Sequence, residues 1–84
     1  MLNTQVMQDI AVEREKQVKQ WGGSEFDDKN LPADWHQYIL KQQDKFLFEA
    51  IFPEPNPVEC RDRLIKIAAL AIAAIESLDR KVTA

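Results

Sequence analysis

The chain has 84 residues, 45% of them hydrophobic, and a formal net charge of −3 at pH 7, as expected for one small globular domain. A domain of this length buries only about 60% of its unfolded surface, and its single cysteine forms no internal disulfide, so we expect homo-oligomerisation to add stability. The acidic balance without a basic cluster argues against nucleic-acid binding, and the polar, amphipathic start argues against a signal peptide. We therefore expect a cytoplasmic protein.

The first predicted helix spans about residues 3–20. Asn3 or Thr4 can cap its start, and Gly22-Gly23 ends it because glycine adopts the left-handed terminal conformation at little cost. Apolar residues form one broad stripe, namely Val6, Met7, Ile10, Val18 and Trp21. The charged run that lies between them is predicted to be mostly solvated, and it consists of Glu13, Arg14, Glu15 and Lys16.

Residues 24–31, SEFDDKNL, are predicted to form a polar loop. The glycines before it have neither the dinucleotide-binding nor the P-loop spacing. For Asp27 and Asp28, a solvated turn is favoured over a metal site. Trp21 and Trp35 flank the loop, and we favour hydrophobic closure of this end over a stacking surface for a base.

The second predicted helix spans about residues 33–52, with Pro32 in its first turn. Its apolar side includes Trp35, and five polar residues at 41–45 interrupt its hydrophobic pattern. His36 is expected to be a partly exposed residue at the helix start. Because the chain has no second histidine, a zinc site or a catalytic triad is not supported.

The third predicted helix spans about residues 57–81 and follows a proline-rich connector. Asn56 caps it, Pro57 takes the first helical position, and Cys60 is expected to be a small core residue. Residues 67–75, IAALAIAAI, are nine consecutive apolar residues that wrap the whole helix, so either the rest of the chain or a second copy must cover them. This run is too short for a membrane span, which needs about 20 residues.

These elements predict an all-α fold, a single three-helix domain over residues 1–84 that oligomerisation completes as a helical bundle. The residues predicted at the oligomer interface are Ile67, Leu70, Ala71, Ala74 and Ile75. Asp62 and Lys66, four apart, are predicted to form a surface ion pair. Glu76 and Asp79 share a helix face and could bind Mg²⁺ or Mn²⁺, although pairing with Arg80 or another helix is the favoured alternative.

Both ends of the chain resemble short MazG-like proteins of phages and actinobacteria. The opening segment carries Ile10, Ala11, Glu13, Arg14, Gln17, Trp21 and Gly22, and the acidic Glu25-Phe26-Asp27-Asp28 follows. The closing segment carries Leu64, Ile67, Ala68, Ala69, Ala71, Ile75, Glu76, Asp79 and Arg80. The resemblance covers about residues 9–81, with Phe26 in place of the histidine that is usual in the family.

This resemblance implies an all-α nucleoside triphosphate pyrophosphohydrolase fold, in which helical dimers or tetramers use Mg²⁺ to cleave between the α and β phosphates. Several carboxylates must converge to hold the metal that activates water. Here the first metal-ligand stretch falls on Lys41, Gln42 and Lys45, and the second falls on Arg63 and Lys66. The resemblance therefore implies the family's fold without its standard catalytic site. The acids left for a rearranged Mg²⁺ site are Glu49, Asp62, Glu76 and Asp79.

We expect a MazG-like nucleotide-binding protein in which basic side chains hold phosphate directly. The expected nucleotide-binding residues are Lys41, Lys45, Arg63, Lys66 and Trp35. Three alternatives stay open: a divergent Mg²⁺-dependent pyrophosphohydrolase, a non-catalytic phage or prophage protein that sequesters a nucleotide or binds a host protein, and a structural helical oligomer. The expected partners are a second copy of the chain in a homodimer or homotetramer, a nucleotide and a host protein.

Overall fold

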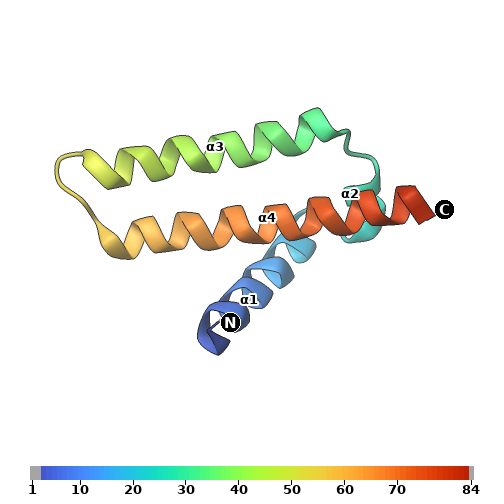
Figure 1. Ribbon diagram of the computed structural model, residues 1–84, viewed down its shortest axis with the longest axis horizontal. Helices are drawn as coiled ribbons and strands as arrows, with labels where there is room; N and C mark the ends of the chain where they lie inside the picture. The colour runs from blue at the N-terminus through green and yellow to red at the C-terminus, as the bar shows by residue number, and fades with distance from the viewer. Residues whose placement is uncertain (1–2, 84) are drawn as a thin grey trace.

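The computed structural model describes residues 3–83, and it is helical apart from short connections. The helices are α1 (Thr4–Trp21), α2 (Ser24–Asp28), α3 (Pro32–Ile51) and α4 (Pro57–Thr83). Helices α3 and α4 form an antiparallel pair, and α1 crosses α4 at an angle (Figure 1). Because α4 contacts each of the other three helices, it is the element on which the fold is built. The all-α prediction and the three long helices are confirmed.

The predicted signals for the start and end of α1 and for the start of α4 are confirmed, and the long helices end within two residues of the predicted bounds. Asn3 Oδ1 accepts a hydrogen bond from the Gln5 backbone N–H at 2.8 Å, which satisfies a donor in the first turn of α1. Gly22 ends α1 with φ 109° and donates its N–H to the Val18 carbonyl. At the start of α4, Asn56 Oδ1 accepts from the Glu59 N–H at 3.2 Å. These signals are local, so the sequence alone predicts them correctly.

Helix α2 corrects the prediction of a polar loop over residues 24–31, because residues 24–28 are helical. The solvated-turn interpretation of its two aspartates is also wrong. Asp27 is only 6% exposed, and its backbone carbonyl accepts from Ser77 Oγ at 3.2 Å. Asp28 is exposed but accepts from Ser77 Oγ at 3.0 Å and pairs with Arg80 at 2.8 Å. Contacts with α4, distant in the sequence, hold this turn in place.

The buried core is small and lies where α3 meets α4. Its centre is Trp35 against Leu70 and Ala73, with Ile39 and Ala74 packed beside it. The rest of the chain covers only part of the apolar run of α4, because Leu70 and Ala73 are buried whereas Ile72 is 38% exposed and Ile75 is 57% exposed. Of the residues predicted at an oligomer interface, Leu70 is buried inside the chain, Ile67, Ala71 and Ala74 are partly buried, and Ile75 is exposed.

Two smaller expectations have different outcomes. His36 is exposed in the first turn of α3, which is close to the predicted placement. Cys60 is partly exposed rather than buried, because it lies in the first turns of α4, beyond the core. Across residues 3–83, no helix is long and apolar enough to cross a membrane.

Candidate functional site

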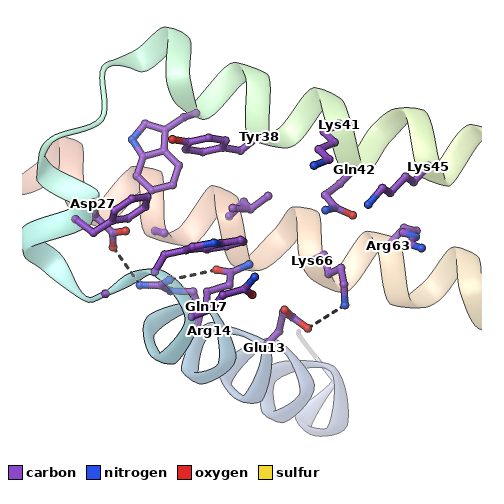
Figure 2. A pocket seen from close by; sticks show the side chains of 17 residues that line it. Glu13, Arg14, Gln17, Asp27, Tyr38, Lys41, Gln42, Lys45, Arg63 and Lys66 are labelled. Carbon is purple, nitrogen blue, oxygen red and sulfur yellow. Dashed lines mark hydrogen bonds and ion pairs between the residues drawn. The ribbon is translucent and has the colours of Figure 1, made fainter.

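A cavity of about 500 Å³ is lined by residues from all four helices, with α1 and α3 forming its walls and α4 its floor (Figure 2). Every residue predicted to bind a nucleotide lines this cavity, namely Lys41, Lys45, Arg63, Lys66 and Trp35. The side chains form two groups along the cavity, a cationic one and an aromatic one.

The cationic end lies between the second half of α3 and the first half of α4. Lys41 and Lys45 are four residues apart, so they project from the same face of α3. Arg63 and Lys66 of α4 line the same cavity. Figure 2 shows the lysines of α3 extending toward α4, with Gln42 between them.

Among residues 3–83, three of these four cations have no acidic partner. Lys66 Nζ lies 3.3 Å from Glu13 and 3.2 Å from Asp62, which confirms the predicted Asp62–Lys66 ion pair. For Lys41, Lys45 and Arg63, no carboxylate of residues 3–83 lies within ion-pair distance. Unpaired cations that face one cavity are available to an anionic ligand.

Two buried polar atoms at this end also have no hydrogen-bond partner in the described part of the chain. They are Arg63 Nε, a donor, and Gln42 Oε1, an acceptor. A buried polar atom without a partner costs roughly 1–3 kcal/mol. A ligand with phosphate oxygens and hydroxyl groups would satisfy both atoms.

The aromatic end lies where α1, α2 and the start of α3 meet. Trp35 is 5% exposed in the core and forms an edge-to-face contact with Tyr38, with ring centroids 5.8 Å apart. Trp21 is 49% exposed. The expected role of closing this end of the fold therefore fits Trp35, whereas Trp21 leaves half of its surface open at the cavity.

Buried polar residues of α1 form one wall of the cavity, although the sequence predicted a solvated face here. Glu13 is 9% exposed and Gln17 is 7% exposed. Arg14 donates to Gln17 Oε1 at 3.2 Å and to Asp27 Oδ2 at 3.4 Å, which links α1 to α2. The i,i+4 spacing of Glu13 and Gln17 was a signal that they share a face, but nothing local shows that this face meets α4.

The cavity is positive although the chain is acidic. Its lining has two anionic side chains, Glu13 and Asp27, and five cationic ones, so its formal charge is +3 against −3 for the whole chain. The cationic residues are Arg14, Lys41, Lys45, Arg63 and Lys66. A concave site of one charge sign concentrates ligands of the opposite sign.

The four carboxylates considered for a metal site do not gather in the structure. Glu49 is near the end of α3, Asp62 is near the start of α4, and Glu76 and Asp79 are near its end. Asp62 pairs with Lys66, and Glu76 lies 3.9 Å from Arg14. Residues 3–83 contain no group of three or more His, Cys, Asp or Glu side chains placed to hold a metal ion.

Ion pairs outside the cavity hold α1 and α2 against α4. Arg61 donates to Asp9 Oδ2 at 2.7 Å, and this hydrogen bond lowers the pKa of the Asp9 carboxyl. A hydrogen bond from Arg80 likewise lowers the pKa of the Asp28 carboxyl, and the Ser77 hydroxyl makes a smaller contribution in the same direction. The Asp28 carboxylate in turn raises the pKa of Arg80. Both pairs favour the arrangement of helices that forms the cavity.

Comparison of the chain with protein-family models, with curated protein sequences and with solved structures gives no match. The case for function therefore rests on the residues of the cavity.

Proposed function

We propose that this chain is a nucleotide-binding protein that holds the phosphates directly on basic side chains and does not hydrolyse them. The observation that supports this most strongly is that Lys41, Lys45 and Arg63 line one cavity together with an exposed aromatic ring, and that none of the three has an acidic partner in the described part of the chain. Charge-assisted hydrogen bonds from lysine and arginine are strong ligands for phosphate oxygens. The positive formal charge of the cavity matches the negative charge of a nucleotide.

We further propose that the chain is a divergent MazG-like protein of phage or prophage origin that sequesters its nucleotide in the cytoplasm. Hydrolysis in that family needs carboxylates to hold Mg²⁺, and the corresponding positions here include Lys41, Lys45, Arg63 and Lys66. These side chains repel a divalent cation but attract the phosphates that the cation would otherwise hold. The alternative, Mg²⁺-dependent pyrophosphohydrolysis, would need a site assembled from the dispersed acids Glu49, Asp62, Glu76 and Asp79.

We also propose that the chain works as a homodimer or homotetramer. The support is a row of exposed apolar side chains on α4, at Leu64, Ile72, Ile75 and Leu78, which a monomer leaves in water. A second cluster at the end of α3 consists of Leu47, Phe48, Ile51 and Phe52, each more than half exposed. This second cluster favours an additional candidate function, in which the oligomer binds a host protein. Exposed apolar patches on small proteins are typical of interaction surfaces.

Reversing one charge in the cavity tests the nucleotide proposal. We expect Lys45→Glu to weaken binding of nucleoside triphosphates, measured by calorimetry in EDTA, by at least roughly 10- to 150-fold. A lost charged hydrogen bond costs about 1.5–3 kcal/mol, and the new carboxylate adds repulsion. The matched control is Lys16→Glu, which makes the same charge change at an exposed position of α1 outside the cavity. Equal affinity in the two variants would refute phosphate binding at this end.

A further inference from the structure

Resting on the proposed function, we infer that the nucleotide lies in one fixed direction along the cavity, with its base stacked on Trp21 and its phosphates on Lys41, Lys45 and Arg63. Trp21 is thereby assigned as the base-binding residue.

The cavity lining changes character along α3. Trp35 and Tyr38 line it near the start of this helix, and Lys45 lines it three turns later. Ten residues of α-helix separate Trp35 from Lys45, which corresponds to a rise of roughly 15 Å. A ligand that uses both ends must be elongated, with a planar apolar group at one end and several negative charges at the other. A nucleoside triphosphate has this form.

Trp21 is the most exposed of the aromatic rings that line the cavity. Trp35 is 5% exposed and packs against Leu70, Ala73 and the ring of Tyr38, so little of its surface is open to a base. Tyr38 is fixed by the hydrogen bond that its hydroxyl donates to Asn30 Oδ1 at 2.9 Å. Trp21 is 49% exposed, and a large open indole face is the surface on which a base stacks.

The backbone fixes the position of Trp21. It is the last residue of α1, and Gly22 follows with φ 109°, a conformation that L side chains rarely adopt. A Cβ atom at Gly22 would lie 3.3 Å from Phe26 Cβ, so the start of α2 packs closely against this turn. Trp21 is therefore held at the junction of α1 and α2, where it lines the cavity.

The experiment compares ligands that carry both a base and a chain of phosphates with a ligand that carries the phosphates alone. Calorimetric titrations in EDTA use the four ribonucleoside triphosphates and inorganic tripolyphosphate, which has the charge but no base. The variants are Trp21→Ala, Trp21→Phe and Lys45→Gln, each first checked for an unchanged helical circular dichroism spectrum.

We expect Trp21→Ala to weaken binding of the best nucleoside triphosphate by roughly 5- to 150-fold, the range typical for a lost base–aromatic stack. Its affinity for tripolyphosphate should stay within about twofold of the wild-type value, because the cations are intact. Trp21→Phe keeps a stacking ring and should recover most of the nucleotide affinity. Lys45→Gln should weaken the binding of both nucleotide and tripolyphosphate. In the wild type, nucleotide but not tripolyphosphate should quench tryptophan fluorescence, and Trp21→Phe should abolish this quenching.

Each other outcome overturns the inference in an identifiable way. If Trp21→Ala leaves nucleotide affinity unchanged, or weakens nucleotide and tripolyphosphate equally, the base does not stack on Trp21 although the proposed function stands. If the wild-type protein binds neither ligand, the proposed function fails and the inference fails with it.

Discussion

Glu13 is the acidic residue that most directly opposes an anion in the cavity. It is 9% exposed, it lines the cavity, and its Oε1 lies 3.3 Å from Lys66 Nζ. In the empty protein it neutralises part of the positive charge of Lys66. A phosphate bound nearby must compete with this carboxylate for the lysine and is also repelled by it.

We therefore expect Glu13→Gln to raise the affinity for nucleoside triphosphates by roughly 5- to 150-fold. Removing a charge a few ångströms from the phosphate changes the interaction free energy by about 1–3 kcal/mol at effective protein dielectric constants. Glutamine keeps the shape and can still accept from Lys66. Glu15→Gln is the matched control, since Glu15 is exposed on the same helix and outside the cavity. Calorimetry in EDTA measures both variants, and unchanged or weaker binding in Glu13→Gln would contradict a phosphate near Lys66.

For single residues, the sequence correctly predicts those features that depend only on residues nearby in the chain. Asn3 and Asn56 cap their helices as predicted, because capping needs only the next three residues. The burial of Glu13 and the exposure of Trp21 depend on where α4 and α2 lie, and no local pattern encodes that placement. The cationic site residues were predicted through a resemblance to a family pattern, and no local feature of the sequence shows that they line one cavity.

Among the elements, α2 is the one that the sequence did not predict. Its five residues are too few for a recognisable helical period, and its stability comes from contacts with α4. Ser77 and Arg80 of α4 hold Asp28, and Lys81 donates to the Asn30 carbonyl at 2.7 Å just beyond α2. The contacts between α2 and α4 also position the turn that carries Trp21.

The Asp28–Arg80 pair predicts a specific pH dependence of folding stability. The hydrogen bond from Arg80 lowers the pKa of Asp28 in the folded protein relative to about 3.9 in the unfolded chain. The stabilisation is therefore fully present above the unfolded pKa and is lost as the pH falls through the lowered folded pKa. Asp28→Asn should be less stable than wild type at pH 7, and this difference should shrink below about pH 4.

Denaturant unfolding between pH 7 and pH 2.5 measures this difference. Asp44→Asn is the control, because Asp44 is exposed in the middle of α3 and forms no ion pair with any of residues 3–83. A stability difference between wild type and Asp28→Asn that stays constant across the acid range would show that the carboxylate charge contributes nothing to docking α2.

In the whole molecule, the antiparallel α3–α4 pair brings the cationic residues together. Lys41 and Lys45 are about 20 residues from Arg63 and Lys66 in the sequence, and the proline-rich connector turns the chain so that they face each other. The order and bounds of the long helices could be predicted from capping signals and hydrophobic pattern. The crossing of α1 over α4, and with it the cavity, could not, because many packings satisfy the same pattern.

Ile75 tests the proposed oligomer, since it is 57% exposed in the single chain. We expect the wild type to sediment as a dimer or tetramer at micromolar concentration. Ile75→Glu should sediment as a monomer with the same helical content, because burying a charge at the interface is costly. Gln43→Glu adds the same charge at an exposed polar position of α3 and should not change the assembly. A wild-type monomer would contradict the oligomer.

One experiment decides between direct phosphate binding and metal-dependent catalysis. The wild-type protein is titrated in a calorimeter with the four ribonucleoside triphosphates, first in EDTA and then in Mg²⁺. Release of pyrophosphate is measured in parallel. If Lys41, Lys45 and Arg63 hold the phosphates, binding persists in EDTA and no pyrophosphate appears under either condition. Binding that requires Mg²⁺ and releases pyrophosphate would contradict this mechanism, and the absence of heat with every nucleotide would contradict nucleotide binding itself.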